Sequence, residues 1–239
     1  MLKSLSAKLS IAVLFSAFIV PAHAVQVLTN GTFDTGITGW TSFVTANGTI
    51  TDPPNPPLGP QVPQIASTAS FDVTGSGASS ALFLNAGGTS FTGTQQGGGV
   101  SQTFSTMGGV ATFSADIAAW TRSNSLGIGL LSVLIDNVLM ASYDFGNADG
   151  SSGAVTLRST LGFTTDLSAG SHTLTLLATR GFAPASGVTN QYFDNASLDV
   201  AQTPLPAALP MFISGLGVVG ALWRRNAKKR KAEAAPIAA

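Results

Sequence analysis

Apolar and polar residues alternate along much of the chain, and residues 110–120 show this most clearly. Small or apolar side chains occupy every second position there, with polar ones between them: Ala111, Phe113, Ala115, Ile117 and Ala119 against Thr112, Ser114 and Asp116. Successive residues of a strand point to opposite faces of its sheet, so the pattern predicts a half-buried β-strand.

Similar alternation predicts further strands on both sides of this segment. They lie at residues 81–87, 99–106, 171–180 and 190–200. Two more strands flank Asp136 and Asn137, a pair suited to a tight hairpin turn. No part of residues 25–202 shows the apolar stripe of a helix. We therefore predict an all-β domain over residues 25–202, an antiparallel β-sandwich or jelly roll, with a proline-rich surface loop at 51–64.

The first 24 residues have the three parts of a secretory signal peptide. Lys3 and Lys8 precede an apolar run over residues 9–20, and a small-x-small cleavage site follows at 22–24. The apolar run is short for a membrane span, which favours cleavage after Ala24 over an uncleaved anchor. The segment therefore predicts an exported protein.

Three different segments follow one another after residue 202. The first is a proline motif, Thr203, Pro204, Leu205 and Pro206, and the second is a predicted transmembrane helix over about residues 207–223. The third, at 224–231, is a basic cluster of Arg224, Arg225, Lys228, Lys229, Arg230 and Lys231. Basic residues stay on the cytoplasmic side of a membrane, so the predicted domain lies on the other side. Residues 232–239 are expected to form a disordered tail.

This order of segments resembles the PEP-CTERM sorting signal of Gram-negative bacteria, with Leu205 where that family has a glutamate. The resemblance implies transient anchoring in the inner membrane and cleavage near the proline motif by an exosortase-type protease. It also implies release to the cell surface or the extracellular matrix. A plain tail anchor is the alternative interpretation of the same residues.

Charge is distributed very unevenly between the predicted domain and the C-terminal tail. Residues 25–202 contain ten Asp, three Arg and neither Lys nor Glu, a formal net charge of −7. Nucleic-acid binding requires Lys and Arg to neutralise phosphates, so this composition excludes nucleic acid as a partner. The chain has no Cys, which removes disulfides and thiol catalysis.

Both ends of the predicted domain resemble galactose-binding-like jelly rolls. The opening resemblance rests on Asn30-Gly31, Phe33, Asp34 and Gly39-Trp40, and the closing one on residues 192–200. The resemblance implies that the first and last strands lie side by side. It also implies a structural calcium ion where they meet, held by Asp34 and Asp194 with Asn30 or backbone carbonyls assisting.

The residues themselves give an independent reason to consider Asp194. It shares strand parity with Tyr192, Ala196, Leu198 and Val200, which predicts an inward-pointing carboxylate unless a bulge intervenes. A buried carboxylate needs a partner, and calcium favours carboxylate and carbonyl oxygens. The alternative is an aspartate that accepts hydrogen bonds from backbone N–H groups at a strand end.

No set of residues specifies a chemical reaction, so we predict that the protein is not an enzyme. The leading hypothesis is a non-enzymatic exported protein of the cell surface or extracellular matrix, sorted by its C-terminal signal. The alternative is a carbohydrate-binding module that recognises exopolysaccharide, with Trp120 as the first candidate for sugar contact. Trp120 falls on the polar side of its predicted strand, beside Arg122. A secreted hydrolase using paired Asp residues is the second alternative.

Overall fold

The computed structural model describes residues 24–51, 65–88, 94–181, 189–202 and 223–224. Within the unit His23–Thr203, the described residues form strands, turns and bends. The strands are β1 (Ala24–Gln26), β2 (Thr41–Val44), β3 (Gly48–Thr49), β4 (Ser67–Phe71), β5 (Ser79–Leu84), β6 (Gly87–Gly88), β7 (Gln96–Thr121), β8 (Asn124–Ser125), β9 (Leu130–Ile135), β10 (Val138–Asp144), β11 (Ala148–Asp149), β12 (Val155–Arg180) and β13 (Thr189–Gln202). The predicted all-β class is therefore confirmed for this unit.

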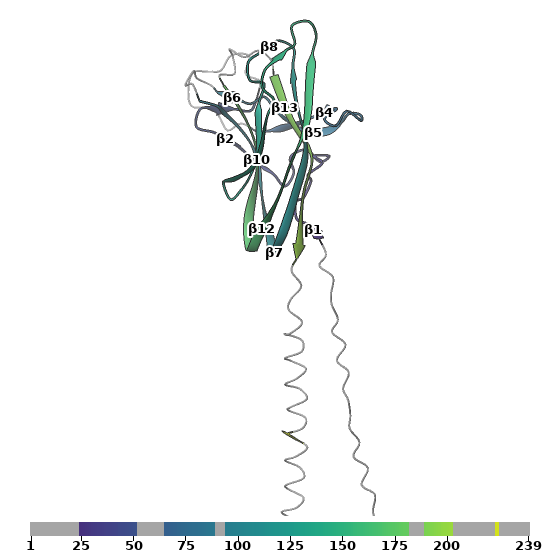
Figure 1. Ribbon diagram of the computed structural model, residues 1–239, viewed down its shortest axis with the longest axis vertical. Coiled ribbons are helices and arrows are strands. Elements are labelled where there is room, and N and C mark those ends of the chain that lie inside the picture. The colour runs from purple at the N-terminus through teal and green to yellow at the C-terminus, as the bar shows by residue number, and fades with distance from the viewer. Residues whose placement is uncertain (1–23, 52–64, 89–93, 182–188, 203–222, 225–239) are drawn as a thin grey trace, which may run out of the picture. The chain divides into compact units, whose positions relative to one another are not determined.

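Most strands belong to one continuous antiparallel sheet. Its order is β10-β9-β12-β7-β13-β5-β4, with β1 paired to β13 and β2 paired to β7 (Figure 1). Two short pairs, β8 with β11 and β3 with β6, lie outside this sheet. The pairing of β1 with β13 agrees with the expectation that the first and last strands are neighbours.

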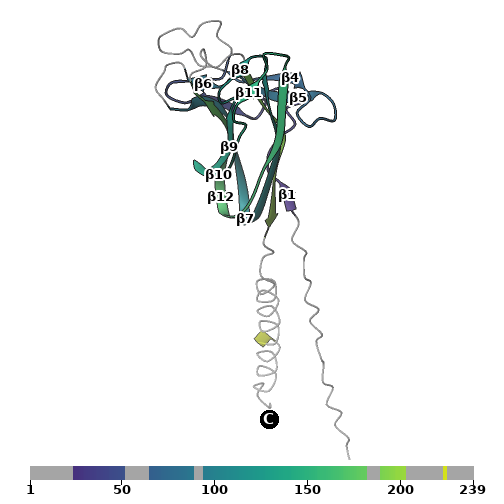
Figure 2. The ribbon, with the colours of Figure 1, turned by 45° about the horizontal axis from the view of Figure 1, so that its top comes forward.

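Two long strands turn this sheet into a sandwich. β7 and β12 have 26 residues each and pair along their whole length. Gly108, Gly109 and Gly170 interrupt them with φ values of 86°, 138° and 143°, which favour glycine. On one side of this bend, β12 pairs with β9 through residues 174–179 and β7 pairs with β2 through residues 98–101, whereas on the other side β7 pairs with β13 through residues 109–121. The two halves of each strand thus belong to two facing layers (Figure 2).

The main core fills the space between the layers. Phe113 and Ile117 of β7 and Phe193 of β13 contribute from one layer, each at most 1% exposed. Leu174 and Leu176 of β12 contribute from the other layer and are fully buried. Burial of one such side chain contributes about 1.5–3 kcal/mol, so this inner stripe is what holds the layers together.

The strand predictions can now be compared with the structure. The alternation over residues 110–120 is confirmed, and this segment is one strand, β7, together with the predicted 99–106 segment. Asp136 and Asn137 both have positive φ, 51° and 65°, and join β9 to β10 as the predicted hairpin turn. β2, β4 and the first half of β12 were not predicted.

Several predicted segments lie wholly or mainly outside the described residues. These are the signal peptide, the proline-rich loop from residue 52 onward, the sorting motif 203–206, most of the predicted transmembrane helix and the basic cluster apart from Arg224. Trp223 and Arg224 are described as helical and exposed. In the described part of the chain, none of the helical residues forms a segment long and apolar enough to cross a membrane.

Candidate functional site

Four aromatic side chains gather on the side of β4, β5, β13 and β7 that faces away from the main core. We call Phe71, Phe83, Trp120 and Tyr192 the outer aromatic face. Tyr192 pairs across the sheet with Phe83 and stacks on Phe71, with ring centroids 3.8 Å apart and planes 3° from parallel. Tyr192 is buried, whereas the other three side chains are half-buried. The face is therefore a small apolar cluster with three rings reaching the surface.

Trp120 forms the end of this face on β7. It lies opposite Asn190 of β13, and the guanidinium carbon of Arg122 is 5.5 Å from its ring centroid. A cation at this distance from an indole is attracted to the ring. The structure thus places Trp120 on the side of β7 that the alternation predicted, with polar groups beside it.

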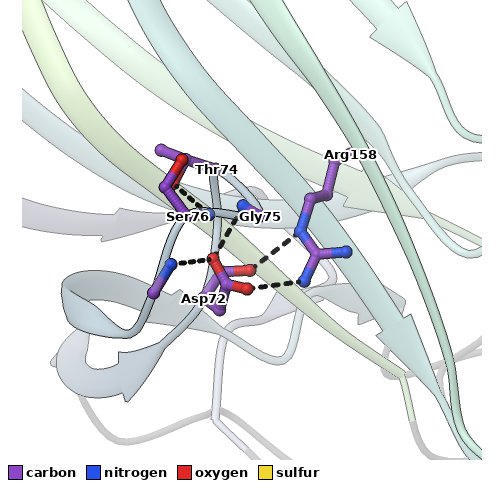
Figure 3. Close-up of polar contacts among 6 residues, drawn as sticks. Asp72, Thr74, Gly75, Ser76 and Arg158 are labelled. Carbon is purple, nitrogen blue, oxygen red and sulfur yellow. Dashed lines mark hydrogen bonds and ion pairs between the residues drawn. The ribbon is translucent and has the colours of Figure 1, made fainter.

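An ion pair fixes the connection between β4 and β5 beside the aromatic face. Asp72 Oδ1 accepts hydrogen bonds from the backbone N–H groups of Gly75 and Gly77, at 2.7 and 3.2 Å (Figure 3). Arg158 of β12 donates to Asp72 Oδ2 at 3.3 Å and to the Asp72 carbonyl at 3.0 Å. The hydrogen bond from Gly77 lowers the pKa of Asp72, so its carboxylate stays charged. The connection is thereby joined to β12, which β7 and β13 separate from β5 in the sheet.

Asp194 departs from the alternation that predicted its direction. The register of β13 shifts between Asp194 and Ser197, and Asn195 between them has a φ of 50°. This β-bulge places Ala196 and Leu198 in the main core but leaves Asp194 on the opposite side. Asp194 therefore shares its side with Tyr192 but not with Ala196, Leu198 and Val200, because the bulge, which the prediction named as the exception, inverts the alternation.

Asp194 is nevertheless only 1% exposed. Its two carboxyl oxygens accept hydrogen bonds from Ser79 Oγ at 2.5 Å and from the Asn195 N–H at 2.7 Å. Burial raises the pKa of Asp194, and the charges of Asp116 and Asp34 act in the same direction. The surroundings of Asp194 thus favour either protonation of its carboxyl group or a cation bound beside it.

The opening loop meets β13 at this bulge. The Ala196 N–H donates to the Gly31 carbonyl at 2.9 Å, which joins the two predicted motifs. The side-chain amide of Asn30 donates to the carbonyls of Gly36 and Thr38, both at 2.9 Å, and so closes its own loop. Asp34 lies near enough to influence the pKa of Asp194, but across the described residues no group of three or more His and acidic side chains converges on a metal position.

A second pair of titratable groups lies at the β9–β10 hairpin. His172 Nδ1 is 2.6 Å from Asp136 Oδ2, and the Thr173 N–H donates to Asp136 Oδ1 at 2.8 Å. The hydrogen bond with Asp136 raises the pKa of His172 and lowers that of Asp136. The pair joins the hairpin turn to β12, which gives His172 a structural role.

The chain matches no protein-family model and no curated protein sequence. Among solved structures it is similar to TmCBM61 in complex with β-1,4-galactotriose, with 10% identity, a TM-score of 0.41, and 73% of this chain and 97% of that chain covered. It is similar to the CBM22-1 xylan-binding domain of Paenibacillus barcinonensis Xyn10C, with 11% identity, a TM-score of 0.35, and coverage of 77% and 97%. It is also similar to the enzymatically active domain of bacteriophage CBA120 tailspike protein 4, with 13% identity, a TM-score of 0.42, and coverage of 72% and 21%.

Proposed function

We propose that this protein binds carbohydrate through the outer aromatic face. The observation that supports the proposal is the half-buried state of Phe71, Phe83 and Trp120, which gather outside the main core. The C–H faces of sugar rings pack well on aromatic rings, and clustered apolar groups at a protein surface commonly mark binding sites.

The size of the face favours an oligosaccharide or polysaccharide as the ligand. Phe71, Phe83 and Trp120 lie on β4, β5 and β7, and β13 runs between β5 and β7. Three strand spacings amount to about 14 Å, which is longer than one sugar ring. The side chains of Asn190 and Arg122 beside Trp120 supply polar groups of the kind that orient a ligand in a mostly apolar site.

A glycan array followed by affinity electrophoresis tests this proposal. We expect saturable binding to a polysaccharide, weakened about five- to twelvefold in Trp120→Ala and in Phe83→Ala, because one ring contact contributes about 1–1.5 kcal/mol. Tyr143→Ala is the matched control, since Tyr143 is 40% exposed on β10, away from this face. Folded Trp120→Ala and Phe83→Ala variants that bind as tightly as the wild type would contradict the proposal.

The cellular setting is a proposal of its own, supported by the sequence of both ends. We propose a non-enzymatic exported protein, held transiently in the inner membrane by residues 207–223 and processed by an exosortase-type protease near Pro204 and Pro206. Its final location is the cell surface or extracellular matrix, where exopolysaccharide is the available polymer. If no glycan binds, we infer a structural or adhesive role that does not involve sugar binding.

Structural calcium also remains a proposal, with Asp34 and Asp194 as its side-chain ligands. It is supported by the burial of Asp194 and by the charges of Asp34 and Asp116, which a divalent cation would offset. Asn30 is the weaker candidate, because its side chain already makes hydrogen bonds within its own loop.

A further inference from the structure

Arg180 is a buried cation at the end of the inner stripe of β12. Leu174, Leu176 and Ala178 of this stripe are fully buried, and Arg180 continues it at 1% exposure. β12 ends at this residue, and the neighbouring Gly181 accepts a backbone hydrogen bond from Gly88 of β6. Arg180 therefore lies inside the sandwich at the end where β6 lies, and not on the outer aromatic face.

The guanidinium of Arg180 is incompletely satisfied. Nη1 donates a hydrogen bond to Thr189 Oγ1, but neither Nε nor Nη2 has a hydrogen-bond partner within the described part of the chain. Within the described part of the chain, the carboxylates that form ion pairs do so with residues other than Arg180, so they do not neutralise its charge. Burial lowers the pKa of Arg180 to about 10, which still leaves the group charged at neutral pH.

Nearby polar side chains already have other partners. Gln191 Oε1 accepts from the Ala86 N–H at 2.8 Å, and Gln191 Nε2 donates to the Ile128 carbonyl at 2.7 Å. Thr189 is fully buried and accepts from Arg180 Nη1. Burying a charge with unpaired N–H groups costs free energy. A hydrogen-bond acceptor other than these neighbouring side chains would therefore stabilise Arg180.

The two unpaired nitrogens define the chemistry of that partner. The Nε–H and one Nη2–H lie on the same edge of a planar guanidinium and point in parallel, which matches the two oxygens of one carboxylate. A carboxylate also carries one negative charge, which balances the one positive charge of Arg180. A phosphate dianion would leave a surplus negative charge in this buried position.

We propose that Arg180 binds the carboxylate of a ligand, and that an acidic sugar such as a uronic acid is one source of that group. The proposal concerns a second site and does not rest on the outer aromatic face. Acetate supplies the carboxylate alone and is small enough to be the first probe of a buried site. Galacturonate adds the sugar, and galactose is its neutral counterpart.

Thermal melting of the full-length protein tests the proposal. We expect sodium acetate to raise the melting temperature of the wild type by about 2–4 °C over sodium chloride at equal ionic strength, with a saturable dependence on concentration. The rise should disappear in Arg180→Gln and persist in Arg158→Gln, whose arginine is exposed and paired. An equal rise in Arg180→Gln, or no rise in the wild type, overturns the proposal.

Two further arms identify the source of the carboxylate. A rise with galacturonate but not with galactose supports an acidic sugar, and a rise with acetate alone supports a small organic acid. Asp52 is the one acidic residue in the sequence between residues 51 and 65. If Asp52→Asn responds to acetate and the wild type does not, the carboxylate is the chain's own and the proposal of an external ligand is wrong.

A measurement on the wild type covers the case in which Arg180→Gln does not fold. Arginine Nε–H resonances report hydrogen bonding at each guanidinium. We expect acetate to move one of these resonances in a saturable way, and the moving signal should remain in Arg122→Gln and Arg158→Gln. A spectrum in which no such signal moves, or in which the moving signal belongs to an exposed arginine, contradicts the proposal.

Discussion

At the scale of single residues, the contact between His172 and Asp136 makes stability depend on pH. The folded state raises the pKa of His172, so its contribution is full below about pH 6.5 and is lost as the pH rises through the folded pKa. The folded state lowers the pKa of Asp136, so its contribution is full above about pH 4 and is lost as the pH falls. Together they stabilise the fold most between these two values.

We therefore expect the wild type to melt at a lower temperature at about pH 9 than at about pH 5.5. Asp136 is 48% exposed, so the pair contributes about 1 kcal/mol or less, equivalent to about 2–4 °C. The pH-dependent part should shrink in Asp136→Asn but not in Asp166→Asn, which changes an exposed aspartate on β12. An unchanged pH profile in Asp136→Asn would show that the pair contributes nothing to stability.

Only part of the candidate site could be predicted from single residues. The outward position of Trp120 follows from simple alternation, because β7 has no bulge around it. The position of Asp194 does not, because a single left-handed residue, Asn195, inverts the pattern after it. The unpaired edge of Arg180 is a property of its three-dimensional neighbours, and the sequence shows only an arginine after an apolar run.

At the scale of elements, the predicted strands were those with apolar alternation or with a recognisable turn between them. β9 joins β10 through an Asp-Asn turn that can be recognised in the sequence. β4 has the sequence Ser-Thr-Ala-Ser-Phe, and none of its side chains is buried. Its sequence therefore lacks the apolar alternation that would predict a strand. Phe71 and Phe83 were missed for this reason, since β4 and its pairing with β5 bring them to the aromatic face.

The contact between the opening loop and β13 predicts a specific intolerance at Gly31. A Cβ atom at this position would lie 1.8 Å from the Ala196 carbonyl oxygen, so the loop or the bulge would have to move. We expect Gly31→Ala to lower the free energy of unfolding by about 1–3 kcal/mol, measured by urea denaturation. Gly162→Ala is the control, because its Cβ would meet the Phe113 carbonyl at an ordinary 3.4 Å. Equal stability of the two variants would contradict the close approach.

Removal of calcium would destabilise this same junction between the opening loop and β13. If Asp34 and Asp194 bind the ion, EGTA should lower the melting temperature of the full-length protein, because ligand binding to the folded state stabilises it. Asp194→Asn should lose this response, and Asp199→Asn on the same strand should retain it. Insensitivity of the wild type to EGTA, together with no calcium by elemental analysis, would remove the ion from the proposal.

At the scale of the whole molecule, the sorting proposal predicts where the chain is found. Cells that express the full chain should hold it in the membrane fraction or at the surface, and cells that express residues 1–202 should release it to the periplasm. A reporter fused after Lys231 should be active in the cytoplasm, because the basic cluster stays there. Protection of the domain from protease added to spheroplasts would contradict this orientation.

The pairing of β1 with β13 sets the earliest moment at which the domain can be complete. Val25 lies opposite Val200, so the sheet joins residues separated by nearly the whole length of the domain. Pairings this distant along the chain form slowly. A ribosome must therefore finish β13 before the sheet can close, and a chain exported while β13 is still being synthesised, as the sorting proposal would allow, would cross the membrane before the domain is complete. Export and folding would then not compete, and the domain would first become whole on the far side of the membrane.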